Sequence, residues 1–194
     1  MIGFLHDPEP SAGAERLYAD DIDELGYVMN VSKLWAYAPD VCDDLFGLMR
    51  SAVAGRLPLR TRAILVVAAT SAFGDSYCAL AWGEKLIAET ATDTAAGVVT
   101  GADTGLTDAE RALAAWARRV ARDPAATTEA DVETLRTAGY SDADIFAMTV
   151  FIALRIAFAT VNDALGVQPD AQLADRVPAE LRAAVTFGRA PARP

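Results

Sequence analysis

The segment 57–86 constrains the fold of this chain more than any other part of the sequence. Pro58 suits the first turn of a helix, where its missing N–H leaves no intrahelical bond unmade, and residues 63–73 form an almost uninterrupted apolar run. Gly74 is the residue type that commonly ends a helix, and Asp75 is a type that caps the start of the next one. The sequence therefore predicts two helices joined at a glycine turn, with the first helix buried on most of its sides.

Cys78 falls in the first turn of the second predicted helix. The positive end of the helix dipole there lowers a thiol pKa from its usual value of about 8.5. Asp75, one turn earlier, acts in the opposite direction because its carboxylate disfavours a second negative charge nearby. The sequence alone therefore leaves open whether Cys78 is reactive.

This arrangement resembles the AhpD and carboxymuconolactone decarboxylase superfamily, most of all its peroxidase-related branch. The motif of that branch is Glu, eleven residues, Cys-x-x-Cys, three residues and His. With Cys78 as the second cysteine, Asp75 stands where the first cysteine would be, Ala63 at the glutamate and Trp82 at the histidine. In the family the cysteine pair carries out the redox chemistry, and Glu and His relay protons. The CxxC motif is therefore degenerate here, and the resemblance supports the fold more firmly than the activity.

The resemblance implies an all-α, AhpD-like fold built around the buried helical hairpin, as a single domain over residues 1–194. We expect the segments 1–11 and 188–194 to be loose. The family also implies a homotrimer or hexamer that acts on a small-molecule substrate without a cofactor, at a site close to subunit contacts.

Cap residues and apolar periodicity predict further helices on both sides of the hairpin. Segment 90–105 is rich in Thr, Ala and Gly, and we expect a loop there that forms the main flexible connection. No segment alternates with the period of two that is typical of strands. The remaining helices are predicted at about 12–25, 32–37, 39–54, 107–122, 128–139 and 141–165, with a last short one from Pro178.

Composition excludes several classes of function. The chain has 194 residues, a formal charge of −10 and no cluster of Lys and Arg, so we expect no nucleic-acid partner. His6 is the only histidine, and two cysteines, Cys42 and Cys78, form neither a disulfide framework nor a metal cluster. We therefore expect no metal site and a reducing, cytoplasmic location.

Hydrophobicity points to an oligomer and not to a membrane protein. The N-terminus lacks the pattern of a signal peptide, and the longest apolar stretch, 145–161, carries Arg155 and is shorter than the ~20 residues of a membrane span. The mean hydropathy is nevertheless +0.19, with 53% hydrophobic residues. This hydrophobicity indicates more apolar surface than a monomer can easily bury, so we expect a homo-oligomer.

Three residues are candidate catalytic groups, and each has a structural alternative. Cys78 could be a nucleophilic thiol or a small buried hydrophobic residue. Asp75 could be a general base in place of the lost cysteine, although an N-cap is the favoured interpretation. Tyr77 could place its hydroxyl in the same pocket or simply pack.

Three further residues are candidates for substrate binding. Trp82 lies one turn after Cys78 on the same helix face, and its bulk would narrow the family's pocket. Arg60 and Arg62 could hold a substrate carboxylate, although pairing with acidic side chains is the stronger expectation. Arg155, inside an apolar helix, needs partners, and we expect a structural ion pair with Asp144, Asp163 or a residue of another subunit.

Three functions remain open at this point. The first is a one-cysteine thiol peroxidase, in which Cys78 attacks a hydroperoxide and an external thiol restores it. The second is a cofactor-free lyase, decarboxylase or isomerase, in which Asp75 and Tyr77 exchange protons while Arg60 or Arg62 holds a small anionic substrate. The third is a non-catalytic oligomeric binding or scaffold protein.

Overall fold

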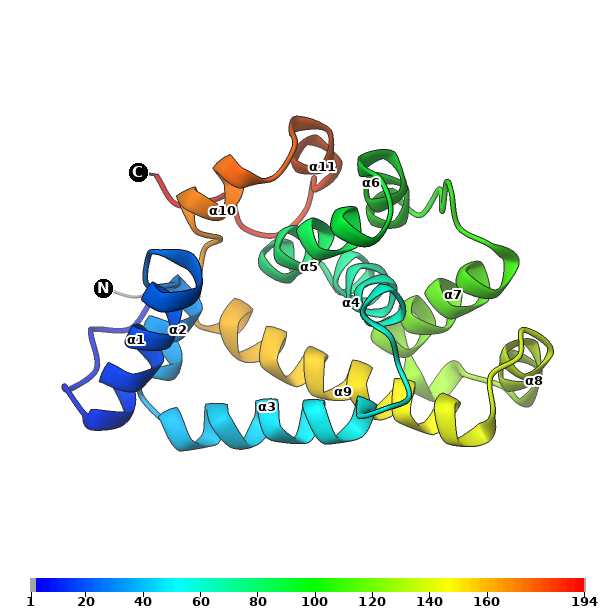
Figure 1. The fold of residues 1–194 in the computed structure, drawn as a ribbon, viewed down its shortest axis with the longest axis horizontal. Helices are drawn as coiled ribbons and strands as arrows, with labels where there is room; N and C mark the ends of the chain where they lie inside the picture. The colour runs from blue at the N-terminus through cyan, green and yellow to red at the C-terminus, as the bar shows by residue number, and fades with distance from the viewer. Residues whose placement is uncertain (1–2, 194) are drawn as a thin grey trace.

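The computed structural model describes residues 3–193, which form an all-α domain with no strand among them. Figure 1 shows α3 along the lower edge with α9 just above it, α4 near the centre, and α5 and α6 above α4. The helices are α1 (Ala12–Leu25), α2 (Asn30–Trp35), α3 (Pro39–Val53), α4 (Leu59–Phe73), α5 (Ser76–Glu89), α6 (Thr92–Thr100), α7 (Asp108–Arg122), α8 (Glu129–Thr137), α9 (Asp142–Ala164), α10 (Ala171–Arg176) and α11 (Ala179–Ala184), with a short 3-10 helix at Pro124–Ala126.

Helix α4 is the centre of the hydrophobic core. Every residue from 63 to 70 is buried, and the helix packs against α5, α6, α7 and α9. Gly74 ends it with a φ of 94°, in the left-handed region where a side chain is strained. Asp75 then caps α5 by accepting a hydrogen bond from the Cys78 backbone N–H at 3.0 Å. The predicted sequence of buried helix, glycine turn and aspartate-capped helix is confirmed.

Helix α9 is the longest helix and lies against α3, α4, α7 and α8. Its 23 residues exceed the apolar stretch seen in the sequence, and by length and composition it could cross a membrane. A central core helix meets the same criteria, and the contacts of α9 with four other helices, α3, α4, α7 and α8, are those of a core helix. Its inner face carries Arg155 into the space between α3 and α5.

The segment expected to be a flexible loop contains a regular helix, so this prediction was wrong. Helix α6 buries Ala95 and Val98, and it packs on α4, α5 and α11. The small residues that suggested a loop are what allow the close packing: a Cβ on Gly97 would lie 2.9 Å from the Thr104 backbone nitrogen. Helix α10 was also not predicted, because its six residues carry no periodic pattern that is long enough to recognise.

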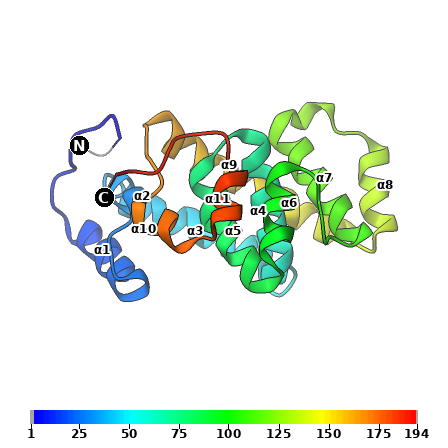
Figure 2. The same cartoon turned by 90° about the horizontal axis from the view of Figure 1, so that it is seen from above.

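The closing segment, expected to be loose, lies along the domain and is held by hydrogen bonds. Figure 2 shows it running from α11 across the molecule towards the N-terminal residues. The Ser76 hydroxyl donates to the Arg189 carbonyl at 2.7 Å, and the Ala192 N–H donates to the Pro169 carbonyl at 2.8 Å. At the other end of the chain, the Phe4 N–H donates to the Leu165 carbonyl at 2.9 Å, and residues 1 and 2 lie outside the described part.

Candidate functional site

Cys78 lies in the first turn of α5 and is 2% exposed. Arg155, which α9 brings in from the opposite side, donates a hydrogen bond from Nη2 to the Cys78 Sγ at 3.3 Å. Its Nη1 donates to the Met49 Sδ of α3 at 3.8 Å. Three helices that are far apart in sequence therefore meet at this thiol, and the guanidinium of Arg155 is hydrogen-bonded to its sulfur.

Arg155 is 5% exposed, and no carboxylate of the described residues forms an ion pair with it. The expected partners on α9 do not pair with it: Asp144 caps α9 and lies 3.6 Å from Arg56, and Asp163 forms no ion pair among residues 3–193. The predicted ion pair within this chain was therefore wrong. The long apolar helix places Arg155 among sulfur atoms and aromatic rings instead, so its charge lacks an anionic counterpart on α9.

The aromatic rings of Trp82 and Phe158 partly stabilise the buried charge of Arg155. The guanidinium carbon lies 5.0 Å from the ring centre of Trp82 and 5.3 Å from that of Phe158, within the range of a cation–π attraction. The Arg155 Nε is buried and has no hydrogen-bond partner among residues 3–193. A permanently charged, partly unpaired donor therefore lies beside the sulfur.

Asp75, at the N-cap of α5, lies next to Cys78 and is completely buried. Its Oδ1 caps α5, while its Oδ2 has no hydrogen-bond partner in the described chain. Burial raises the pKa of Cys78 well above its usual value, the charge of Asp75 raises it further, and Arg155 opposes both. The resting sulfur is therefore a protonated thiol between one carboxylate and one guanidinium.

The charge of Asp75 also affects the carboxyl group of Asp163, near the end of α9. Burial raises the pKa of Asp163 to about 6, the charge of Asp75 adds to the rise, and Arg189 opposes it. The Arg189 Nη2 donates to the Asp163 backbone carbonyl at 2.9 Å. The end of α9 and the closing segment thus lie close to the Asp75 side of the thiol.

Trp82 lies next to the thiol site, as the helix spacing predicted. It is half-buried, and both Trp82 and Cys78 contact Arg155. Phe151 packs edge-on against its ring at a centre-to-centre distance of 6.1 Å, and the Lys85 Nζ lies 5.2 Å from the ring centre. The indole therefore forms a fixed wall of the site.

Tyr77 is tied to a different part of the molecule. Its hydroxyl donates a short hydrogen bond to Asp170, whose other oxygen accepts from the Asn30 N–H at 2.7 Å. Burial and the charge of Asp170 raise the pKa of Tyr77 far above its usual value, so the phenol stays protonated. Tyr77 thus links α5 to α2 and the segment before α10, and it makes no hydrogen bond to Asp75 or Cys78.

Arg60 and Arg62 also lie outside the cluster at Cys78. Arg60 forms a two-pronged ion pair with Glu110, with a closest distance of 2.5 Å, and donates to the Glu89 carbonyl at 3.0 Å. This pairing lowers the pKa of Glu110 to about 2. Arg62 is half-buried and forms no ion pair among the described residues. Of the six predicted site residues, the structure therefore brings together Asp75, Cys78 and Trp82.

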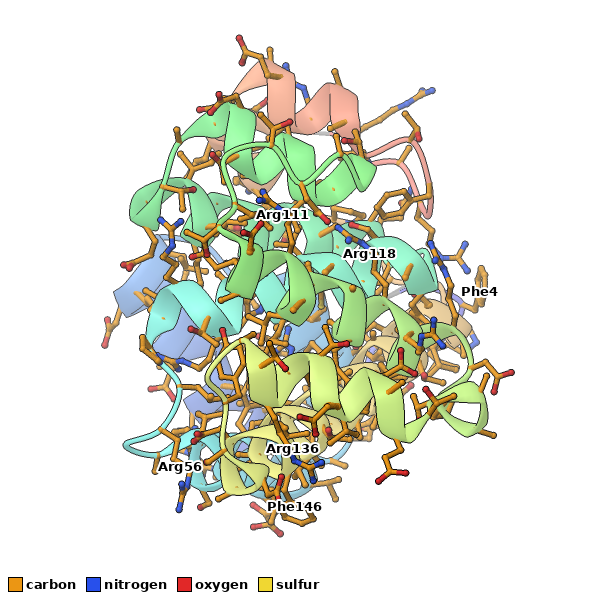
Figure 3. All side chains as sticks on the ribbon, turned by 90° about the vertical axis from the view of Figure 1, so that its right-hand side faces the viewer. Phe4, Arg56, Arg111, Arg118, Arg136 and Phe146 are labelled. Carbon is orange, nitrogen blue, oxygen red and sulfur yellow. The ribbon has the colours of Figure 1, made fainter. Side chains whose placement is uncertain are left out.

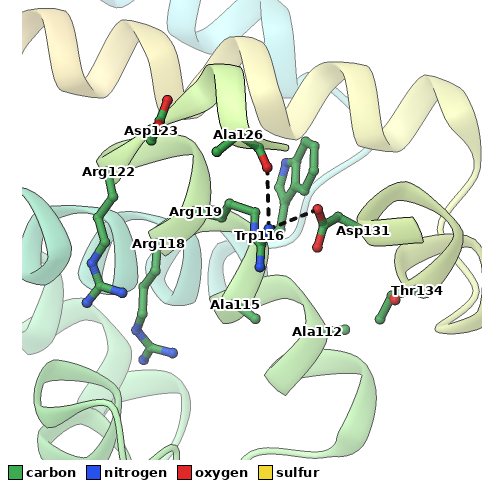
Figure 4. A pocket seen from close by; sticks show the side chains of 10 residues that line it. All are labelled: Ala112, Ala115, Trp116, Arg118, Arg119, Arg122, Asp123, Ala126, Asp131 and Thr134. Carbon is green, nitrogen blue, oxygen red and sulfur yellow. Dashed lines mark hydrogen bonds and ion pairs between the residues drawn. The ribbon is translucent and has the colours of Figure 1, made fainter. Parts of the chain in front are cut away.

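The hollow between α7 and α8 is not part of this site. Its volume is about 460 Å³, and Figure 4 shows Arg119 paired within it, 3.2 Å from Asp131 and 3.4 Å from the Ala126 carbonyl. Arg118 is neutralised by Asp103 at 2.6 Å. The hollow lacks a nucleophile and an unpaired buried charge, so we do not assign it a catalytic role.

No other group in the described chain offers equivalent chemistry. Cys42 is also buried, and burial raises its pKa to about 11 without a cation beside it. No cluster of three or more His, Cys, Asp and Glu side chains within residues 3–193 could hold a metal ion. The chemistry of the site therefore depends on Asp75, Cys78 and Arg155.

Comparison with solved structures identifies the fold. An uncharacterised peroxidase-related protein with an AhpD core from Ralstonia eutropha JMP134 superposes with a TM-score of 0.79 at 24% identity, over 89% of this chain and 95% of that one. The chain has an AhpD-like fold. A peroxidase-related protein from Silicibacter sp. TM1040 gives 0.77 at 21% identity, over 88% and 93% of the two chains. The debrominase Bmp8 gives 0.75 at 18% identity, over 95% and 100%.

These similarities confirm the predicted all-α, AhpD-like fold. No family model matches the sequence, and no curated protein matches it. At these identities the fold is shared but the activity does not follow, so the chemistry of this AhpD-like protein has to come from its own residues.

Proposed function

We propose that this AhpD-like protein is a one-cysteine thiol oxidoreductase of the peroxidase type, with Cys78 as its nucleophile. The hydrogen bond from Arg155 to the Cys78 Sγ carries the proposal. A buried guanidinium without a carboxylate partner stabilises an anion beside it, and a thiolate is the anion that Cys78 can form.

Asp75 removes the proton from the thiol in this proposal. Loss of the proton to water would leave two buried negative charges against one positive charge, which the raised pKa of Cys78 reflects. Transfer to Asp75 instead conserves the net charge of the trio, because the carboxylate is neutralised as the thiolate forms. One carboxyl group thus takes the place of the family's Glu and His.

The oxidation step then balances with the residues present. The thiolate attacks the terminal oxygen of a hydroperoxide, an S–O bond forms, the O–O bond breaks, and the leaving alkoxide takes the proton held by Asp75. Cys78 becomes a sulfenic acid, and the substrate leaves as an alcohol. An external thiol condenses with the sulfenic acid, releasing water, and a second thiol reduces the mixed disulfide.

Trapping of the sulfenic acid tests this function. A Cys42→Ala protein is treated with tert-butyl hydroperoxide and dimedone, and the modified residue is located by mass spectrometry. We expect an adduct on Cys78, no adduct in Cys78→Ser, and a slower reaction in Asp75→Asn. A folded protein that gives no adduct at Cys78 would refute the proposal.

Cleavage of a carbon–bromine bond is a second candidate for the same thiol. The aromatic walls formed by Trp82 and Phe158 favour a flat substrate, and the similar debrominase has been solved, as a cysteine-to-alanine variant, in complex with 2,3,4-tribromopyrrole. The thiolate would take bromine as an S–Br bond forms, Asp75 would protonate the carbon, and an external thiol would displace bromide. Bromide release from this pyrrole, compared with alcohol formation from the hydroperoxide, separates the two candidates.

We also propose that the protein is cytoplasmic and assembles as a homotrimer or hexamer through the outer face of α9. Phe146 is 72% exposed and projects from the molecule in Figure 3, and Val161 on the same stripe is 37% exposed. No charged residue lies on this stripe between them, which favours self-association of a chain with a charge of −10. Sedimentation of Phe146→Glu against wild type tests it, and a monomeric wild type would exclude it.

A further inference from the structure

The closing segment 186–193 passes over the turn that carries Asp75. Ser76 donates a hydrogen bond to the Arg189 carbonyl at 2.7 Å, and Arg189 donates to the Asp163 carbonyl at the end of α9. Gly188 approaches the turn so closely that a Cβ on it would lie 2.7 Å from the Gly74 carbonyl oxygen and 2.7 Å from the Ser76 Oγ. Gly74 and Ser76 flank Asp75, so the segment covers the Asp75 side of the thiol site.

The site behind this segment is closed to solvent. Asp75 is 0% exposed and Cys78 is 2% exposed, yet the Asp75 Oδ2 and the Arg155 Nε have no partners among residues 3–193. Such unsatisfied buried groups are costly in a site that serves only packing. Any reagent that reaches the sulfur must first displace one of the surrounding elements.

The closing segment is the element that is displaced most easily. None of its described residues is fully buried, and Phe187 is its one side chain that packs against the hydrophobic core. Its other contacts are hydrogen bonds and the approach of Arg189 to the Phe4 ring. Trp82, by contrast, contacts Arg155, Phe151 and Lys85 and belongs to a 14-residue helix. Segments with few buried apolar contacts open at a lower free energy than core helices do.

We propose that segment 186–193 is a displaceable cover over the Asp75 side of the Cys78 site, and that its release admits small reagents to the sulfur. The closed position keeps water and large thiols from the reacting atoms. This inference does not depend on the proposed reaction, because it concerns access to Cys78 and not what Cys78 reacts with.

Alkylation of Cys78 by iodoacetamide in a Cys42→Ala background measures access directly. Gly188→Ala combines a φ of +70° with a contact against the Gly74 carbonyl, so the cover must shift. Its control is Gly139→Ala, which has a φ of +97° but nothing within 4 Å of the added Cβ. A chain that ends at Val185 removes the cover altogether.

We expect labelling about tenfold faster in Gly188→Ala, a larger increase in the shortened chain, and the unmodified rate in Gly139→Ala. Circular dichroism verifies that each protein is folded, and Gly188→Ala alone decides the outcome if the shortened chain does not fold. Equal rates in folded Gly188→Ala and wild type would overturn the proposal. So would faster labelling in Trp82→Ala alone, because the entrance would then lie at Trp82 and not at the closing segment.

Discussion

Replacing Arg155 with methionine should make Cys78 a much poorer nucleophile. The guanidinium Nη2 lies 3.3 Å from the sulfur and is the one group that lowers the pKa of this buried thiol against burial and Asp75. Methionine fills a similar volume without charge, so the core stays packed while the stabilisation of the thiolate is lost. Arg155→Lys is the matched control, because it keeps the charge but loses the planar donor geometry.

The size of the effect follows from the short distance. Two unit charges separated by 3.3 Å interact by about 5 kcal/mol at an effective dielectric constant of about 20. Relaxation reduces this, and opposite charges this close typically shift a pKa by about 1–3 units. At a fixed pH below the thiol pKa, we therefore expect the alkylation rate of Arg155→Met to fall by about 10- to 1,000-fold, with a smaller loss in Arg155→Lys.

The assay is the rate of iodoacetamide alkylation between pH 6 and 10, in a Cys42→Ala background and with thermal unfolding measured in parallel. Because removal of an unpaired buried charge is often neutral for stability, we expect the free energy of unfolding to change by less than about 1 kcal/mol. An unchanged pH–rate profile in folded Arg155→Met would refute the reasoning. A lower melting temperature with that unchanged profile would show that the guanidinium is structural only.

Three further predictions concern residues around the site. Tyr77→Phe leaves the buried Asp170 carboxylate short of a donor and should cost about 1–3 kcal/mol in chemical unfolding, and a slower alkylation of Cys78 would contradict this structural role. Glu110→Gln breaks the pair with Arg60 and should lower the unfolding free energy by about 1–2 kcal/mol at pH 7. Folding lowers the pKa of Glu110 from 4.5 to about 2, so this difference from wild type should vanish as the pH falls through that range. Folding raises the pKa of Asp163 from 3.8 to about 6, so ionisation of this carboxyl destabilises the folded wild type as the pH rises through that range. The unfolding free energy of Asp163→Asn should therefore increase by about 2 kcal/mol relative to that of wild type over the same range. A pH-independent difference in unfolding free energy would contradict this.

The local structure around the thiol was accessible from the sequence because short-range rules govern it. The apolar run of α4, the left-handed Gly74 and the Asp75 cap depend on residues within one or two turns of each other, and each was predicted where the structure has it. The position of Trp82 beside the site follows from the same helix spacing. The resemblance in these residues also indicated the fold that the structural comparisons confirm.

The sequence was less informative where the structure depends on packing of small residues or on contacts between residues far apart in the chain. The run of Thr, Ala and Gly in 90–105 has weak local preferences, and α6 forms because packing on α4, α5 and α11 buries it. Arg155 was recognised as needing a partner, but the two carboxylates of this chain that were named for it, Asp144 and Asp163, lie on α9 itself. The actual partners, Cys78 and Met49, come from α5 and α3.

The sequence by itself determined most of the helices and their caps, though not α6 or α10, and the position of Cys78 at the start of α5. Only the tertiary structure decided what surrounds that cysteine: Arg155, 77 residues away along the chain, and the closing segment that covers Asp75. Caps and periodicity are set by neighbours a few residues apart. The electrostatics of a buried thiol are set by whichever charges the packing of distant helices brings within a few ångströms, and no local pattern in the sequence encodes that distance.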